Sequence, residues 1–244
     1  MPERRPLVVI ACRALEELIR SVLPAEVPMT FMGYELHVRP KEMRPALQEK
    51  LEALAAPSIV LLGYGLCGNG VVGLRSGQHV LVTPRTHDCI AIFLGSFHAY
   101  AERFHKDPAT FYLTKGWLES GDGPLFDYRE YVRDYGEETA NDLIDMLYRH
   151  YRRLCFVAFS DTELVQYRAQ LDEVAEFCRT RLNMTYEEVR GSDALIAQLA
   201  AMPAHLDDGN EEFVVVPPGG EVRESMFHRS GGVPGPARKT TSNS

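Results

Sequence analysis

The sequence predicts an α/β fold: a Rossmann-like, mainly parallel sheet flanked by helices and divided between two similar lobes. Short aliphatic runs alternate with helical segments along the chain, which is the rhythm of parallel β-α units. Several of these runs are continuously apolar, as expected for strands that are buried on both faces. A chain of 244 residues with 45% hydrophobic content can bury a substantial core.

The N-terminal lobe is expected to span residues 7–118. Its strands are expected at 7–11, 29–34, 58–63, 79–84 and 111–114, where β-branched and aliphatic residues gather. Helices are expected at 15–19, 41–54 and 90–104, because apolar residues recur there at helical spacing. The order of these segments predicts consecutive β-α units.

The C-terminal lobe is expected to span residues 124–218, after a polar, glycine-containing boundary at 119–123. Helices are expected at 128–153, 165–182 and 193–202, and strands at 155–159, 185–189 and 212–216. The tail is rich in glycine, proline, serine and basic residues and has little apolar content. We therefore expect residues 225–244 to be disordered.

Composition limits the classes of partner. The chain has 26 basic and 34 acidic residues and a net charge of −8, so it offers no overall attraction for nucleic acid or anionic lipid. The apolar run at 7–12 is too short for a signal peptide, and no stretch reaches membrane-spanning length. We expect a cytoplasmic protein with reduced thiols, acting on a small molecule rather than on nucleic acid or a membrane.

Cysteines follow three of the predicted strands. Cys12 ends the first, Cys67 lies in the loop after the third, and Cys89 lies in the loop after the fourth. Because loops converge at the carboxyl ends of parallel strands, these thiols can together bind zinc or an iron–sulfur cluster with one position left open. Their spacing matches no compact metal motif, so a single reactive thiol and purely structural cysteines remain alternatives. Cys155 and Cys178 are expected in the core.

A glycine-rich run at 63–70 follows the third strand. It formally matches the dinucleotide-binding fingerprint, but the short interval before the next strand leaves no room for the helix that such a site needs. We predict instead that Gly65, Gly68, Asn69 and Gly70 allow close approach of the backbone to a cofactor, or positive φ angles. A simple tight turn is the alternative.

Polar residues at 85–89 supply further candidate chemistry. Arg85 can lower a thiol pKa or bind an anionic substrate, and His87 or Asp88 can transfer protons. Asp88 can alternatively cap the helix that begins near residue 90. Glu35 and His37 can contribute an acid or a ligand after the second strand, although ordinary loop positions are the simpler interpretation.

These motifs, together with Leu94-Gly95-Ser96 and the segment 111–117, resemble an uncharacterised bacterial and archaeal family catalogued as domain of unknown function 1638. The resemblance covers roughly residues 7–216 and strengthens the choice of Cys12, Cys67 and Cys89. Members are similar to proteins found alongside corrinoid-dependent methyltransferases. The resemblance therefore implies a corrinoid methyltransferase system as a partner, and a role in one-carbon or methylated-amine metabolism.

The leading hypothesis is a metal-dependent enzyme whose three-cysteine zinc or iron–sulfur site processes a small thiol or methyl-transfer substrate. One alternative is a metal-free enzyme in which Cys67 attacks the substrate. The other is a noncatalytic accessory protein that carries a metal or a corrinoid-related ligand.

Overall fold

The structure is a computed structural model that describes residues 5–34, 36, 39–206 and 211–228. The chain forms two compact units: the first comprises Met1–Ala101 and Asp193–Ser244, and the second comprises Glu102–Ser192. These units differ from the lobes expected at 7–118 and 124–218, because the chain returns to the first unit after residue 192. The predicted α/β class, with parallel sheets flanked by helices, is confirmed.

The first unit is built on a five-stranded sheet with the order β2-β1-β3-β4-β8. Its strands are β1 (Leu7–Cys12), β2 (Met29–Met32), β3 (Ile59–Gly63), β4 (Val80–Pro84) and β8 (Phe213–Val216). The first four run parallel, whereas β8 pairs antiparallel with β4 and places Val214 opposite Thr83. The last predicted strand therefore completes the first sheet.

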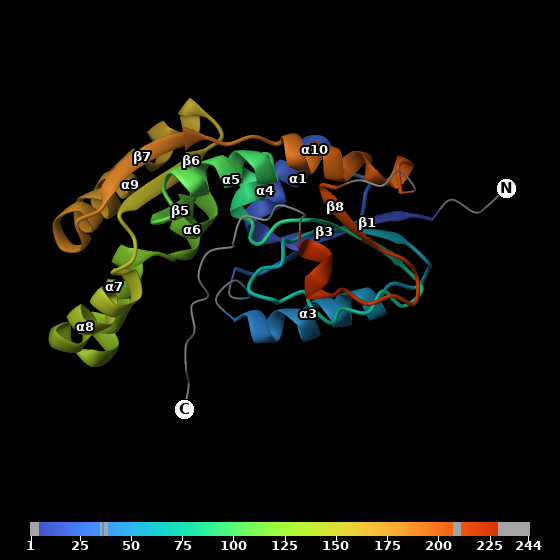
Figure 1. Cartoon of the computed structure of the whole chain (residues 1–244), viewed down its shortest axis with the longest axis horizontal. Coiled ribbons are helices and arrows are strands. Elements are labelled where there is room, and N and C mark those ends of the chain that lie inside the picture. The colour runs from blue at the N-terminus through green and yellow to red at the C-terminus, as the bar shows by residue number, and fades with distance from the viewer. Residues whose placement is uncertain (1–4, 35, 37–38, 207–210, 229–244) are drawn as a thin grey trace. The chain divides into compact units, whose positions relative to one another are not determined.

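Helices cover both faces of this sheet. The helical segments of the first unit are η1 (Arg13–Leu15), α1 (Glu16–Val22), α3 (Pro40–Glu52), α4 (Ile90–Phe93), α10 (Ala194–Ala201), η2 (Met202–Ala204) and η3 (Glu224–Phe227), with α5 (Phe97–Lys106) crossing into the second unit. Figure 1 shows α3 on one face and α1 and α10 on the other. In agreement, α10 contacts both α1 and β4.

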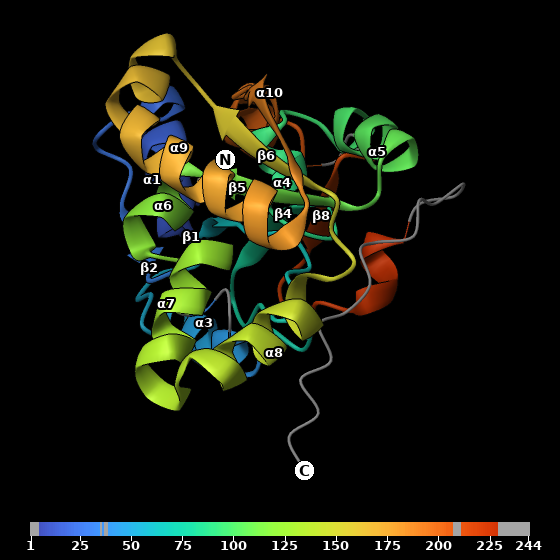
Figure 2. The ribbon, with the colours of Figure 1, turned by 90° about the vertical axis from the view of Figure 1, so that its left-hand side faces the viewer.

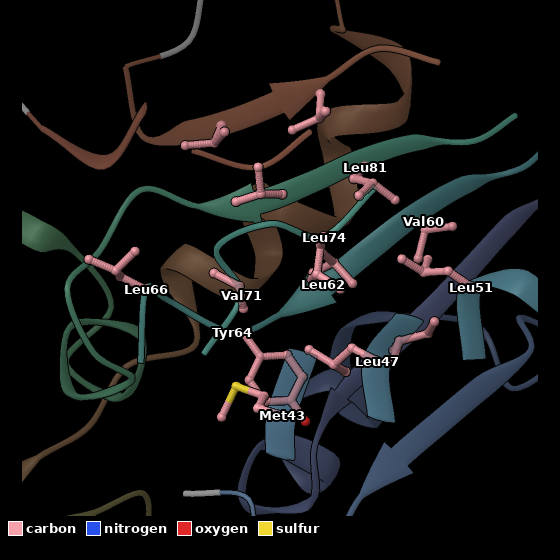
Figure 3. Close-up of a cluster of buried hydrophobic side chains, with 14 of the residues drawn as sticks. Met43, Leu47, Leu51, Val60, Leu62, Tyr64, Leu66, Val71, Leu74 and Leu81 are labelled. Carbon is pink, nitrogen blue, oxygen red and sulfur yellow. The ribbon is translucent and has the colours of Figure 1, made fainter. Parts of the chain in front are cut away.

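The core between α3 and the sheet includes side chains from residues 64–79, the connection between β3 and β4 (Figure 3). Leu66, Val71 and Leu74 are buried there against the α3 side chains Met43, Leu47 and Leu51. Residues 64–79 therefore connect two parallel strands through turns whose apolar side chains fill the place of a crossover helix. Without a helix in this connection, the dinucleotide fingerprint lacks the structure that it needs.

The C-terminal part of the first unit also enters this core. Val222 is 0% exposed and Phe227, the last residue of η3, is 1% exposed. Disorder from residue 225 is thus a wrong prediction for the beginning of the tail; its remainder, 229–244, lies outside the described residues. A single large aromatic side chain is enough to hold a polar segment when a preformed apolar core receives it.

The second unit contains a three-stranded parallel sheet with the order β5-β6-β7. These strands are β5 (Thr110–Thr114), β6 (Arg153–Ala158) and β7 (Thr185–Arg190), and the helices are α6 (Lys115–Ser120), α7 (Pro124–Tyr135), α8 (Glu137–Tyr148) and α9 (Asp161–Leu182). The long helix α9 packs along β6 and β7 (Figure 2). Apolar residues of α9 and the sheet supply the core of this unit.

Glycines divide two helices that the sequence pattern predicts as continuous. The segment 128–153 breaks at Gly136, between α7 and α8, and the segment 90–104 breaks at Gly95, between α4 and α5. Their φ angles of 81° and 82° lie in the left-handed region, which ends a right-handed helix. The apolar spacing continues past both glycines, and it therefore predicts one helix where the structure has two.

Candidate functional site

The predicted thiols lie at the carboxyl ends of β1, β3 and β4. From β1 the chain passes through α1 to β2 on one side, whereas β3 connects to β4 on the other. The loops that leave β1 and β3 therefore diverge, and such a switch point is where open α/β sheets bind ligands. Cys12 is the last residue of β1, and Cys67 follows β3 by four residues. The topology thus places both thiols at this switch point.

The loop after β3 lies against the loop after β4. The amides of Leu66 and Cys67 donate hydrogen bonds to the carbonyl oxygens of Thr86 and His87, at 2.8 and 3.0 Å. A Cβ added at Gly65 would lie 2.5 Å from Thr86 Oγ1 and 2.8 Å from Thr86 O. Only glycine fits at position 65, because these atoms belong to the neighbouring loop.

Cys67 begins a turn in an unusual backbone conformation. Cys67, Gly68 and Asn69 have φ angles of 46°, 63° and 70°, all in the left-handed region. The amide of Gly70 closes the turn on the Cys67 carbonyl at 3.1 Å. Left-handed φ costs free energy in a residue with a side chain, and such residues cluster at functional sites. The conformation of Cys67 is therefore the strongest local sign of function in this loop.

The remaining glycines predicted to approach a cofactor have different surroundings. A Cβ added at Gly70 would lie 2.6 Å from Met43 Sδ, so Gly70 serves the packing of α3 against the turn. Gly68 is exposed, and a Cβ there would lie 3.6 Å from Cβ of Pro40, the first residue of α3. The N-terminus of this 13-residue helix carries a partial positive charge close to the turn, which favours an anionic group there.

The three predicted thiols lie within electrostatic range of one another. The pKa of Cys67 is raised to about 12, first by burial and then by the nearby Cys12 and Asp88, against a smaller lowering by the Gly65 amide. The pKa of Cys89 is also raised well above its usual value, first by burial and then by Cys67, Asp88 and Cys12. Negative charge on Cys12 or Asp88 thus opposes ionisation of Cys67 and Cys89. A bound cation would offset this repulsion.

Exposure differs among these thiols. Cys89 is buried, whereas residues Cys12 and Cys67 are each partly accessible and pack at the margin of the apolar core. An arrangement with one enclosed and two accessible cysteines leaves a side from which a small molecule can approach.

Asp88 is held by neighbouring donors. Its Oδ1 accepts a 2.9 Å hydrogen bond from the Ile90 amide, and its Oδ2 accepts one of 3.2 Å from the Tyr100 hydroxyl. Burial raises the pKa of the Asp88 carboxyl, while the amides of Ile90 and Ala91 and the Tyr100 hydroxyl act in the opposite direction. The carboxylate therefore ties α4 and α5 to the site, in keeping with its helix-capping interpretation.

Arg85 and His87 occupy different positions along the same loop. Arg85 Nη2 donates to the carbonyl oxygen of Phe213 at 3.1 Å, and its amide donates to Glu212 O at 2.7 Å, so Arg85 fastens this loop to β8. The ring of His87 is partly exposed and lies 6.5 Å from the ring of Phe97. Like Arg85 and Asp88, His87 is therefore partly accessible to a solvent-borne substrate.

Two site residues were not singled out from the sequence. Thr86 is 1% exposed, and its hydroxyl has no hydrogen-bond partner among the residues that the structure describes. The hydroxyl of Tyr100 donates a hydrogen bond to Asp88. No sequence pattern around Tyr100 predicts this bond. Tyr100 lies in α5 and Asp88 lies before α4, and the two helices are separated by the break at Gly95.

The two other cysteines lie in the core of the second unit. Cys155 is 0% and Cys178 1% exposed, and neither is among the groups that shift the pKa of Cys67 or Cys89. Glu35 and His37 lie outside the described residues. Among those that are described, no three His, Cys, Asp or Glu side chains are already arranged as a metal site. Binding of an ion by the thiols would need their side chains to turn toward a common centre.

Comparison with protein families identifies one match. A family described as "Protein of unknown function (DUF1638)" matches residues 31–200. The chain belongs to this family. No curated protein and no solved structure matches it. The family resemblance predicted from the motifs is confirmed.

The DUF1638 match covers part of the site. It includes the left-handed turn and the loop after β4, with Cys67 and Cys89, whereas Cys12 and the segment around η3 lie outside residues 31–200. The family description assigns no activity.

In the part of the chain that the structure describes, no helix has the length and apolar character to cross a membrane.

Proposed function

We propose that Cys12, Cys67 and Cys89 bind a thiophilic metal, either zinc or the iron of an iron–sulfur cluster, and that the protein is an enzyme acting on a small thiol or methyl-transfer substrate. The observation that carries the proposal is geometric: the three cysteines lie at or after the ends of β1, β3 and β4 at the switch point of the sheet, and backbone hydrogen bonds hold the loop with Cys67 against the loop that leads to Cys89. Cysteine sulfur is the ligand that soft metals prefer, and three protein ligands are typical of catalytic zinc sites.

The arrangement of the chain supports an open site rather than a structural one. Two cysteines are partly accessible, and Gly68, which adjoins Cys67, is exposed. When bound, such a metal would supply Lewis acidity, which lowers the pKa of a substrate thiol or water. Cys12, Cys67 and Cys89 would hold the ion.

The polar residues around the thiols would have separate roles. His87 is a candidate for proton transfer, because its imidazole ring is partly exposed and lies in the loop that leads to Cys89. Asp88 would position α4 and α5 through its bonds to Ile90 and Tyr100. Arg85 is engaged by Phe213, so its contribution to anion binding would be through charge.

Metal analysis after anaerobic purification tests the proposal. We expect near-stoichiometric zinc or iron in the wild-type protein, lost in Cys67→Ser. Cys178→Ser is the matched control, because Cys178 is buried in α9 of the second unit and should affect packing alone. Equal metal content in both variants, or a wild-type protein that remains empty after reconstitution with zinc and with iron plus sulfide, would refute metal binding.

A second candidate function is a metal-free enzyme with Cys67 as the nucleophile. The left-handed φ of Cys67 favours it, since a strained turn directly after a strand is one way in which folds present a nucleophile. The Gly65 amide favours the thiolate form of Cys67, but burial outweighs it and raises the pKa of this thiol to about 12, so the attacking thiolate would need a base. Stoichiometric alkylation of Cys67 in an active, metal-free preparation, with loss of activity, would support this candidate over the first.

The partner system is part of the proposal. A corrinoid-dependent methyltransferase would receive or supply the methyl group if the protein acts in methyl transfer. Binding to a corrinoid protein, measured by calorimetry for the wild-type protein and Cys67→Ser, distinguishes a substrate-handling site from an accessory one. An accessory protein would bind the partner with or without the Cys67 thiol.

A further inference from the structure

The segment 217–227, here called the C-terminal strap, lies along residues 73–76 in the connection between β3 and β4. The Val222 amide donates to Leu74 O, and the Gly73 amide donates to Val222 O, both at 2.9 Å. A further bridge pairs Arg75 with Glu221 in antiparallel orientation. The strap thus adds backbone hydrogen bonds to the segment that follows the Cys67 turn.

Side chains fix the two ends of this contact. Ser76 Oγ donates to Pro217 O at 2.7 Å, and its amide donates to Gly220 O at 3.0 Å. Val222 and Phe227 are buried in the core shared with α3. Since the strap is anchored in this core, any group that it presents to the turn is held in place rather than free to move away.

One side chain of the strap reaches the left-handed turn. Asn69 Nδ2 donates to Glu224 Oε2 at 3.4 Å, and Glu224 begins η3 between the buried Val222 and Phe227. The backbone of Asn69 also has a left-handed φ angle, and its carbonyl oxygen accepts a hydrogen bond from the Val72 amide at 3.1 Å. The bond therefore ties the costly conformation of residues 67–69 to a rigid part of the fold.

We propose that the C-terminal strap positions Cys67, with Glu224 and Asn69 as positioning residues that hold the left-handed turn in which Cys67 lies. This inference rests on the proposed role of Cys67 in the site. It extends the functional unit beyond residues 31–200, because the strap lies outside the DUF1638 match. The strap would act through the backbone of the turn, without touching a substrate.

The test compares Glu224→Ala, Glu224→Gln and Glu221→Ala in the full-length, metal-free protein. Glu221 is the matched control: it lies on the same strap and carries the same charge, but it pairs with the exposed Arg75 at 3.8 Å. The probe is the rate of Cys67 alkylation by iodoacetamide at fixed pH, mapped by mass spectrometry. Loss of one hydrogen bond should loosen the turn and accelerate alkylation about three- to tenfold in Glu224→Ala.

Glu224→Gln should restore a rate near that of the wild-type protein, because its side-chain oxygen still accepts from Asn69. Asn69→Gly should accelerate alkylation as Glu224→Ala does, since glycine keeps the left-handed φ available but lacks the donor. The double variant should be no faster than either single variant. Thermal midpoints identify any variant that is globally destabilised.

An unchanged alkylation rate in Glu224→Ala, or an equal acceleration in Glu221→Ala, would overturn the positioning role. Cadmium binding, followed by thiolate absorption, separates this inference from the proposed function. If no variant and no wild-type protein binds cadmium, the metal proposal fails, while the alkylation rates still decide whether the strap positions Cys67. If the wild-type protein binds cadmium but the rates do not differ, the metal proposal stands and the strap is structural.

Discussion

Replacing Phe227 by alanine should destabilise the first unit strongly, although the residue lies near the C-terminus in a polar segment. Phe227 is 1% exposed and packs in the cluster that contains Met43, Leu47 and Leu51. Truncation of a buried phenylalanine costs about 3–5 kcal/mol in a rigid core. Because the strap can relax into part of the space, we expect about 2–4 kcal/mol, close to the transfer free energy of the side chain with a smaller cavity cost.

Urea unfolding followed by circular dichroism measures this loss of stability. A change of about 3 kcal/mol corresponds to a fall of roughly 6–12 °C in the melting midpoint of a chain of this size. Ser225→Ala, at an exposed position in the same η3 segment, should stay within about 0.5 kcal/mol of the wild-type protein. If Phe227→Ala were as stable as Ser225→Ala, the strap would not be anchored in the core, and its proposed control of Cys67 would lose its physical basis.

Three further predictions follow from buried groups elsewhere. His79 is buried, its Nδ1 accepts a hydrogen bond from the Ser58 amide, and burial lowers its pKa below 6.5. The unfolded chain therefore binds more protons, so the stability of the wild-type protein should fall as the pH drops through 6.5, and His79→Asn should flatten this pH dependence in urea unfolding. Gly63→Ala would place a Cβ 2.5 Å from that of Ala11, so it should destabilise the sheet by about 1–3 kcal/mol, with partial rescue by Ala11→Gly in the same assay. Cys178 is 1% exposed, so iodoacetamide should modify it only after unfolding, and modification of the native protein would contradict its assignment to the core.

Strand prediction succeeded because the central strands are buried on both faces. The run from Leu7 to Cys12 and the run from Ile59 to Gly63 are continuously apolar, and this pattern has few other interpretations at such length. Helix boundaries at Gly95 and Gly136 were missed because apolar spacing persists across each glycine. Their left-handed φ angles, which the spacing does not encode, break the helices.

The partner of β8 could not be predicted from local sequence. Its aliphatic residues predict a strand, but its pairing with β4 depends on a return from the second unit over more than a hundred residues. The burial of Phe227 is a related case, because the surrounding segment has the composition of a disordered tail. In both cases the deciding contact is made with a core built by distant parts of the chain.

The candidate site was partly predictable. The rule that loops converge at the carboxyl ends of parallel strands selects Cys12, Cys67 and Cys89, and the structure has these residues at or after the ends of β1, β3 and β4. The bond from Tyr100 to Asp88 and the one from Asn69 to Glu224 were not predicted. Each joins residues whose proximity depends on a turn or a strap, and neither has a sequence signature.

The central claim is that the three cysteines bind one metal together, and X-ray absorption spectroscopy of the zinc-reconstituted protein tests it most directly. We predict three sulfur ligands at about 2.3 Å from the zinc, with a lighter atom completing the shell. Cys12→Ser, Cys67→Ser and Cys89→Ser should each lose one sulfur or fail to bind, while Cys178→Ser should keep all three. A shell of nitrogen and oxygen alone, or a sulfur count unaffected by the three site variants, would contradict the account.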